Sequence, residues 1–505
     1  MNEATPECVP LAHMPQKPDT FITIPADPRP KMPRPASAKL HWEHKEESID
    51  YIATASHVDV RSNTNALIAQ MFSLSYIACE NDEPNTKRPV TFMYNGGPGC
   101  ASVPINFGGM GPKCIKTNGT KHLNYQAELL DNPYTLLKES DLVFFDAPGT
   151  GWSAFAEDAD AKKYFGIDED ADAFARAIMQ WLEDNGRWNS PVFIFGESYG
   201  TIRSAVLMRL LGERGVHVAG VVMLSSIFNW TMTLPDNDYY YLGMLPTFAA
   251  TAQYFKRAGE GIDENTWFDQ AMQFTEEVYA PALLLGDRIS KEKMHEVAQG
   301  MEELIGLPAS YIEEKKLRIS LDMFRFQILR DEEKVCGRLD TRFTSYIPHP
   351  AQTEDAGADS DPSDDAIEST MTMAFRNFCH ETLGYHPPAA YMGNNYASIG
   401  VHWNWKHEAP GTAFAVSAPN VAFDIATALK RSPTTHIAFL GGRFDAATTL
   451  WNTYHDISAL FLPEEIKENT HWYRYGCGHM AYIDIPTLQQ MSKDLHEFYT
   501  AALEI

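Results

Sequence analysis

Short apolar runs alternate with amphipathic stretches through the first half of the chain. Runs of about five apolar residues bounded by turn residues are typical of buried strands, and apolar positions spaced three or four residues apart are typical of helices. The alternation predicts strands at 90–94, 142–146, 192–195 and 218–224, and helices at 171–185 and 201–211. This order of elements predicts a mainly parallel sheet with helices on both faces.

The alternation stops after Ser226 and returns late in the chain. The stretch between is rich in helical patterns, aromatic residues and loops, which favours a cap inserted above the sheet. Beyond it we expect strands at 436–440 and 471–475 and a terminal helix at 488–503. The predicted organisation is a proline-rich arm at 1–38, a core at 39–230 and 401–505, and a largely helical cap at 231–400.

Ser198 lies in Gly196-Glu197-Ser198-Tyr199-Gly200, directly after the apolar run at 192–195. A serine flanked by two glycines on a strand-to-helix turn is the nucleophile elbow of the α/β-hydrolase fold. The glycines are needed because a Cβ at either flank would collide where strand and helix approach. We therefore predict Ser198 to be a catalytic nucleophile; the alternative is a tight turn with a structural role only.

In this fold the acid and the histidine follow the serine in chain order. Asp445 lies in the loop that leaves the predicted strand at 436–440, whereas Asp424 and Asp456 lie in helical patterns. His479 follows the last predicted strand and is bracketed by small residues, with His455 as its close rival. The sequence thus predicts Asp445 and His479 as the partners of the serine.

A glycine-rich loop, Asn95-Gly96-Gly97-Pro98-Gly99-Cys100, follows the predicted strand at 90–94. Such a loop alone usually marks only a turn. Ahead of an elbow, however, its backbone N–H groups are placed to converge on a developing oxyanion.

These segments resemble the serine carboxypeptidase family of peptidases. The loop at 95–100, the segment 145–153, the elbow at 196–200 and Gly478-His479-Met480 are similar to family motifs in the same order, over roughly four fifths of the chain. The segments 337–340 and 245–248 look more like the bacterial branch of the family.

The resemblance implies further roles. The oxyanion donors would be the N–H groups of Gly97 and Tyr199, and Asn95, Gly96 and Glu197 would bind the C-terminal carboxylate of a peptide. A protonated Glu197 would donate to that carboxylate and an ionised one would repel it, so binding should favour acid pH. The alternative for Glu197 is a carboxylate stabilised by the N-terminus of a helix.

One position departs from the family pattern. Gly109 stands where many members carry a second carboxylate-binding glutamate. This departure weakens the expectation of strict exopeptidase specificity, while the chemistry of acyl transfer does not depend on it.

The chain has 505 residues, 44% of them hydrophobic, and a formal net charge of −26. This charge and the lack of a basic patch argue against nucleic acid and membrane surfaces as partners. An acidic stretch, Glu354 to Asp365, is expected to be a solvated loop. The seven cysteines show no metal-ligand spacing, so we predict no metal and no cofactor. No signal peptide is recognisable; the compartment stays open, with a periplasmic or secreted location if a signal was removed.

Together these observations predict a serine-type carboxypeptidase that acts on peptides with a free C-terminus through an acyl-enzyme. An esterase, amidase or acyltransferase on the same scaffold is the nearest alternative, because the fold does not name the substrate. A catalytically silent binding protein is the remote one.

Overall fold

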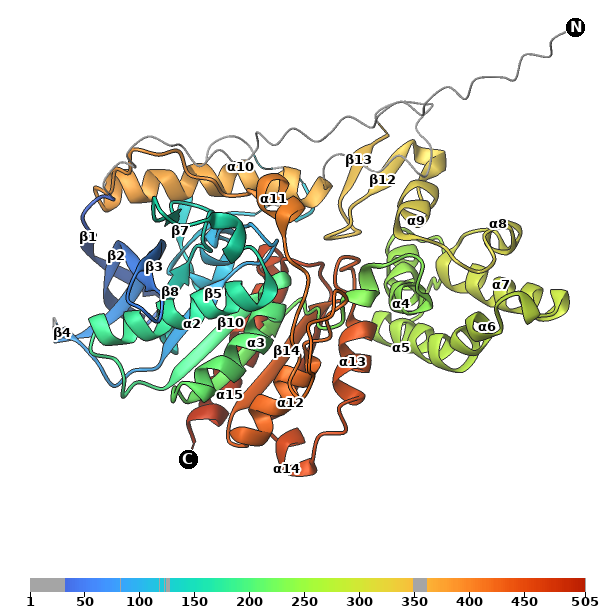
Figure 1. The fold of residues 1–505 in the computed structure, drawn as a ribbon. Helices are drawn as coiled ribbons and strands as arrows, with labels where there is room; N and C mark the ends of the chain where they lie inside the picture. The colour runs from blue at the N-terminus through green and yellow to red at the C-terminus, as the bar shows by residue number, and fades with distance from the viewer. Residues whose placement is uncertain are drawn as a thin grey trace, which may run out of the picture.

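The computed structural model describes residues 32–504, except residues 82, 118, 122, 124–127 and 348–360. Its centre is an eleven-stranded sheet in which strands that are distant in the sequence lie side by side (Figure 1). The spatial order is β1 (Ala36–His44), β2 (Glu47–Arg61), β3 (Leu67–Glu80), β8 (Asp141–Phe145), β5 (Val90–Tyr94), β10 (Val192–Glu197), β11 (Val218–Leu224), β14 (His436–Gly442) and β15 (Thr470–Tyr475), with β4 (Glu83–Pro84) and β9 (Ala154–Phe155) paired to β3.

The strands from β8 to β15 run parallel, and β1, β2, β3 and β8 pair antiparallel. A parallel sheet needs crossover connections, and those after β8 and β10 contain helices, at 167–184 and 199–213, close to the ranges that the 3.6-residue pattern predicted. Together with a serine on the turn after β10, this sheet is that of the α/β-hydrolase fold, as predicted from the sequence.

Successive residues of the central strands pack into two different hydrophobic clusters, which is the two-residue period of a strand buried on both faces. In β5, Phe92 and Tyr94 belong to one cluster and Met93 to the other. The first cluster includes residues of α2 (Ile167–Asp184), α3 (Tyr199–Glu213) and α12 (Ala422–Arg431). The second includes residues of α10 (Pro362–Asn377), η2 (Asn106–Met110), η11 (Ala481–Ile483) and α15 (Ile485–Leu503).

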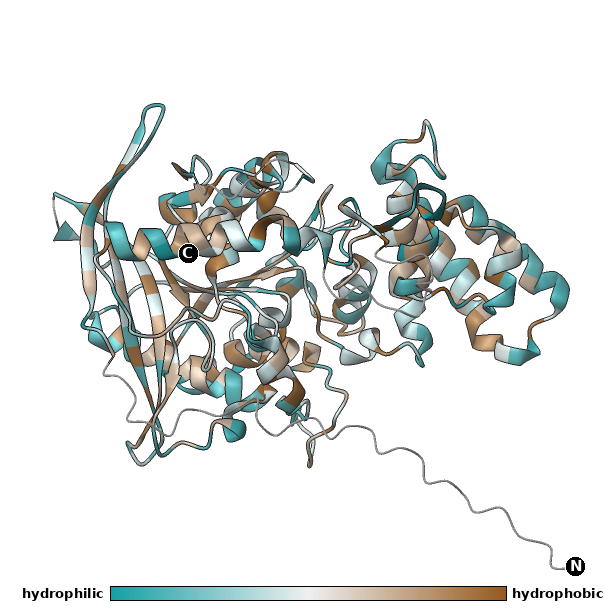
Figure 2. Ribbon diagram, turned by 90° about the horizontal axis from the view of Figure 1, so that it is seen from above, coloured by the Kyte–Doolittle hydropathy of each residue, from teal (hydrophilic) through white to brown (hydrophobic). Residues whose placement is uncertain are grey.

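A third hydrophobic cluster lies outside the sheet and joins a group of helices between β11 and β12. Both views show these helices to one side of the sheet, with hydrophilic residues on many of their outer turns (Figure 2). The group comprises α4 (Asp238–Tyr254), α5 (Glu264–Phe274), η6 (Thr275–Tyr279), α6 (Ala280–Leu285), η7 (Gly286–Arg288), α7 (Lys291–Ile305), α8 (Ala309–Glu314) and α9 (Leu321–Gln327).

The remaining elements are short. They are α1 (Val103–Ile105), β6 (Lys113–Ile115), β7 (Leu129–Asp131), η3 (Leu136–Lys138), η4 (Ala161–Tyr164), η5 (Trp230–Thr233), η8 (Arg330–Glu332), β12 (Lys334–Cys336), β13 (Thr344–Tyr346), η9 (Phe378–Thr382), α11 (Tyr396–Ile399), η10 (Gly400–His402), α13 (Leu450–Ser458) and α14 (Glu464–Lys467).

The stretch predicted as a cap, 231–400, contains two kinds of structure. Its first part forms the separate helical group, whereas α10 packs with η2 and α15 in the second cluster of the sheet. The outer limits of the cap stay a prediction. Of the predicted arm, residues 1–31 lie outside the described residues, and residues 36–38 begin β1.

The expectation of a solvated acidic loop at 354–365 is wrong for its last five residues. Residues 354–360 lie outside the described part of the chain, and Asp361 is the N-cap of α10. Its carboxylate accepts from Ser363 N at 3.0 Å, Arg338 N at 2.6 Å and Leu339 N at 3.1 Å. An Asp-Pro pair at N-cap and N1 favours a helix start, and this local signal outweighs the low hydrophobicity of the stretch. Among the described residues, no helix is long and apolar enough to cross a membrane.

Candidate active site

Ser198 stands at the turn between β10 and α3, with a backbone φ of 61° and ψ of −130°. This conformation is unfavourable for a residue with a side chain, and the surrounding backbone holds it. A Cβ on Gly196 would lie 2.3 Å from the carbonyl oxygen of Gly200 and 2.4 Å from Ser204 Oγ. Because strand and helix approach so closely at this turn, only glycine fits at position 196, as the elbow motif predicted.

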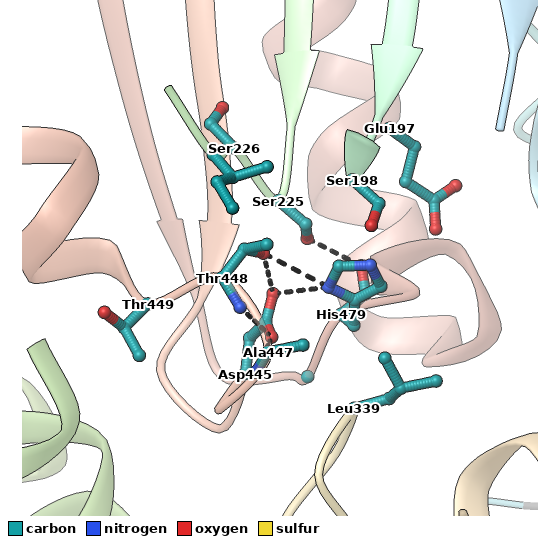
Figure 3. A network of polar contacts seen from close by, with 12 residues as sticks. Glu197, Ser198, Ser225, Ser226, Leu339, Asp445, Ala447, Thr448, Thr449 and His479 are labelled. Atoms are coloured by element: carbon teal, nitrogen blue, oxygen red, sulfur yellow. Dashed lines mark hydrogen bonds and ion pairs between the residues drawn. The ribbon is translucent and has the colours of Figure 1, made fainter. Parts of the chain in front are cut away.

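His479 and Asp445 meet on the other side of the serine. His479 Nδ1 lies 2.7 Å from Asp445 Oδ2, and both side chains are buried. Figure 3 shows the imidazole between Asp445 and Ser198, with the serine hydroxyl directed toward the ring. An Nδ1–H that donates to the carboxylate leaves Nε2 as the nitrogen able to accept a proton from the serine.

Asp445 is held by four donors that come from its own loop and from the histidine. Its Oδ1 accepts from Ala447 N at 2.8 Å and Thr448 N at 3.0 Å, and its Oδ2 accepts from Thr448 Oγ1 at 2.8 Å as well as from His479 (Figure 3). Sequence reasoning missed Thr448; a hydroxyl three residues after an acidic residue is too common a pattern to have identified it.

The backbone of His479 is fixed from two further segments. Its N–H donates to Leu339 O at 2.7 Å, and its carbonyl accepts from Ser225 Oγ at 2.7 Å. Burial lowers the pKa of His479, but the Asp445 carboxylate and the nearby Glu197 outweigh it, so this pKa lies above the usual 6.5. The imidazole is thus suited to accept a proton once Asp445 supports the resulting charge.

The rivals considered for the acid and the base lie elsewhere. Asp424, in α12, is buried between Arg209 and His407 in a separate cluster of charges. His455 and Asp456 lie on α13, and the His455 side chain is half exposed. None of these three residues bonds to Ser198, Asp445 or His479.

The glycine-rich loop lies directly on the elbow. A Cβ on Gly96 would stand 2.5 Å from Tyr199 N, so the loop touches the first turn of α3. Gly97 has a φ of 106°, which favours glycine. Within the described residues, the N–H groups of Gly97 and Tyr199 donate no hydrogen bond. Both N–H groups are thus available as hydrogen-bond donors, as the predicted oxyanion hole requires.

Arg203 holds the glycine-rich loop through a hydrogen bond to its first residue, Asn95. Its guanidinium is fully buried, pairs with Asp170 at 2.7 Å and donates to Asn95 O at 2.8 Å. It also lies 4.1 Å from the centroid of the Phe174 ring. The sequence analysis did not identify Arg203, because only the fold brings α2, α3 and the loop after β5 together.

Glu197 and Asn95 form a buried pair next to Ser198. Asn95 Nδ2 donates to Glu197 Oε2 at 2.7 Å, and Tyr482 OH donates to the same oxygen at 2.8 Å. Burial raises the pKa of Glu197 to about 7, although the positive His479 and the Tyr482 hydroxyl act to lower it. Glu197 therefore keeps its proton to a much higher pH than an ordinary carboxyl group and ionises near pH 7.

A small cavity of about 70 Å³ lies between α10 and the segments that contain Cys100 and Met480. It is lined by Cys100, Asp364, Met371 and Met480, among others. Burial and the neighbouring Asp361 and Glu368 raise the pKa of Asp364 to about 6. In the part of the chain that the structure describes, no His, Cys, Asp or Glu side chains gather into a possible metal site.

Part of the chain is similar to a known family of proteins. Residues 53–214 match the family model of the serine carboxypeptidases. Serine carboxypeptidase-like 37 of Arabidopsis thaliana is 28% identical over 167 residues, which cover 30% of this chain and 33% of that protein. Serine carboxypeptidase-like 51 of the same organism is 30% identical over 167 residues, with the same coverage. The chain thus spans about a third of the length of these curated relatives.

Among solved structures, similarity extends over most of the chain at low identity. Proline iminopeptidase of Mycobacterium smegmatis gives a TM-score of 0.35 at 13% identity and covers 89% of this chain and 99% of its own. Epoxide hydrolase I of potato (Solanum tuberosum) gives a TM-score of 0.35 at 12% identity and covers 88% and 99%. The fold assignment therefore rests on the sheet order and the elbow described above.

Proposed function

Because residues 53–214 match the family model of the serine carboxypeptidases, we propose that the chain is a serine-type carboxypeptidase. It would remove C-terminal residues from peptides through an acyl-enzyme intermediate. The observation that carries this proposal is a buried carboxyl group with a raised pKa, Glu197, which accepts a hydrogen bond from Asn95 directly beside the elbow serine.

In the proposed first step, Ser198 Oγ attacks the scissile carbonyl carbon while His479 Nε2 takes the hydroxyl proton. Asp445 orients the imidazole through Nδ1 and stabilises its positive charge. The tetrahedral oxyanion accepts hydrogen bonds from the N–H groups of Gly97 and Tyr199. His479 then donates the proton to the leaving amine, and water, activated by the same histidine, hydrolyses the ester on Ser198.

Substrate recognition follows from the protonation of Glu197. A neutral carboxyl donates a hydrogen bond to the C-terminal carboxylate of a peptide, and Asn95 and the backbone of Gly96 complete the proposed site. When Glu197 ionises, the two negative charges repel each other across a buried space, where Coulomb energies are large. Binding of free-terminus peptides is therefore expected to weaken above about pH 7.

The nearest alternative is an esterase, amidase or acyltransferase with the same nucleophile. Gly109 supports this alternative, since the second glutamate of many family members has no counterpart there. Such an enzyme would have no use for a neutral carboxyl next to the serine, which is why we favour the carboxypeptidase.

The test is a comparison of two matched substrates and one variant. The wild-type chain should be labelled at Ser198 by a fluorophosphonate and should cleave a blocked dipeptide with a free C-terminus far more efficiently than its C-terminal amide at pH 5.5. Ser198→Ala should lose both the label and roughly 10⁴- to 10⁶-fold in turnover while it stays folded. Equal efficiency on the two substrates would favour the esterase or amidase, and the absence of labelling would favour a binding protein.

A further inference from the structure

Tyr482 contacts Glu197 from a segment that the sequence analysis did not consider. It lies in η11, three residues after His479, and its side chain is fully buried. We propose that Tyr482 is a positioning residue that fixes the carboxyl proton of Glu197 on Oε1, the oxygen that meets the substrate carboxylate. This inference rests on the proposed carboxypeptidase function.

The ring of Tyr482 occupies a slot made by two glycines of η2. A Cβ on Gly108 would lie 2.5 Å from Cδ2 of the ring, and a Cβ on Gly109 would lie 2.6 Å from Tyr482 Cβ. A side chain at position 109 and the tyrosine in its present place therefore exclude each other. The missing side chain at 109 is thus the condition under which the Tyr482 hydroxyl reaches Glu197.

Hydrogen-bond accounting determines which oxygen carries the proton. Ile105 N donates to Asn95 Oδ1 at 3.0 Å, so the amide of Asn95 directs its NH₂ group toward Glu197. That NH₂ group donates to Glu197 Oε2 at 2.7 Å and, more weakly, to the Tyr482 oxygen at 3.4 Å. The tyrosine oxygen therefore accepts from Asn95 and uses its own hydrogen to donate to Oε2 at 2.8 Å.

With two donors on Oε2, the proton of the neutral carboxyl has its place on Oε1. Within the described residues, Oε1 accepts no hydrogen bond, so its O–H is left for the substrate. The hydroxyl of Tyr482 keeps its own proton through the working pH range, because burial and the neighbouring Glu197 raise its pKa well above 10. The donor set on Oε2 is thus the same in acid and in neutral solution.

Several other groups act on the charge of Glu197. His479 lies on one side and favours ionisation when it is positive, whereas Asp445 and Asp364 oppose ionisation. The Cys100 thiol, in the glycine-rich loop at 95–100, is neutral because burial raises its pKa to about 12. Tyr482, like Asn95, stabilises the ionised form by a direct hydrogen bond without carrying a charge.

The test uses Tyr482→Phe, which keeps the ring in its slot and removes the hydroxyl. KM for free-terminus peptides at pH 5.5 should rise about tenfold, as expected for one lost hydrogen bond to a carboxyl group. The effect on the matched C-terminal amide should be much smaller. The alkaline limb of the pH profile should move to higher pH, because the ionised form of Glu197 loses a donor. In a Glu197→Gln background, Tyr482→Phe should still raise KM but should have no alkaline limb to move.

Tyr475→Phe is the matched control, since Tyr475 is also buried and donates to a carboxylate, Asp494 Oδ2, at 2.8 Å. It should change neither the limb nor the ratio of the two substrates. An unmoved limb in Tyr482→Phe, or equal losses on free-terminus and amide substrates, would overturn the inference. A wild-type enzyme that does not distinguish the two substrates would instead overturn the proposed function, so the two failures are separable.

Discussion

Two buried carboxyl groups flank Ser198, and the structure surrounds them differently. Asp445 receives four hydrogen bonds spread over both oxygens, one of them from a histidine able to become positive. Glu197 receives two, both on Oε2 and both from neutral groups. A carboxylate with many donors is stabilised as an ion, while burial with few donors favours the neutral acid. In the proposed mechanism the two acids therefore have different tasks, which the donors around each support.

Of the substitutions considered, Asp445→Asn should have the largest effect on turnover. The amide would place a donor against the histidine, favour the wrong imidazole tautomer and lower turnover by about 10⁴-fold on free-terminus and amide substrates alike. Single-turnover kinetics checks this, with the fluorophosphonate label used to count active sites. His455→Ala, at a half-exposed position, is the control and should retain turnover.

Asp424→Asn tests the rejected rival and needs a separate readout. Asp424 is buried between Arg209 and His407, so this change should lower stability. Turnover per folded molecule should stay near that of the wild type. A loss of turnover as large as that of Asp445→Asn would move the acid of the triad to Asp424.

Asp170→Asn removes the ion-pair partner of Arg203, the residue that donates to the backbone of Asn95 next to Glu197. It leaves the buried Arg203 guanidinium without its carboxylate and should cost about 3–5 kcal/mol of unfolding free energy. Urea denaturation at pH 7 measures this loss. Asp172→Asn, two residues along α2, removes a partly exposed partner of both Arg176 and Arg214 and should cost about 1 kcal/mol or less for each pair. Equal losses would contradict the assignment of the buried pair as the support of the loop.

Glu197→Gln should abolish the pH response that distinguishes the two acids. The amide keeps a donor for the substrate carboxylate, so the decline of free-terminus cleavage above about pH 7 should disappear. Stability provides a second readout. The raised pKa of Glu197 favours folding only while the proton is held, so this contribution is lost as pH rises from about 4.5 through about 7.

The glutamine variant should therefore gain up to about 3 kcal/mol over the wild type at pH 8 and little at pH 4. Urea denaturation at the two pH values checks this. An alkaline limb that survives in Glu197→Gln would show that another group reads the substrate carboxylate.

Thr448→Val sharpens the comparison by removing one of the four donors of Asp445. Turnover should fall roughly tenfold on both substrate types, because one hydrogen bond to a charged carboxylate is lost. Thr427→Val, which removes an exposed hydroxyl bonded to Phe423 O on α12, serves as the control. A loss of turnover confined to free-terminus substrates would show that Thr448 acts in binding the substrate carboxylate, together with Glu197, and not through Asp445.

The elements that depend on local pattern could be predicted from the amino-acid sequence. β5 and β11 begin and end at the residues that the apolar runs predicted. α2 begins four residues before its predicted start and ends one residue before its predicted end, and α3 extends two residues beyond its predicted range at each end. The elbow could also be predicted from the sequence, because a strained serine where a strand and a helix pack closely needs glycine on either side. Chain order then indicated Asp445 and His479, which the structure brings within 2.7 Å of each other.

The tertiary structure alone decided what holds these residues in place. Arg203 supports Asn95 across 108 positions of the chain, and Tyr482 reaches Glu197 across 285. No local pattern records such contacts, because they depend on how α3, η2 and η11 meet around the ends of the strands. Gly109 illustrates the difference. In the sequence it is a missing glutamate, whereas in the fold a Cβ at this position would lie 2.6 Å from Tyr482 Cβ, and two side chains cannot occupy one volume.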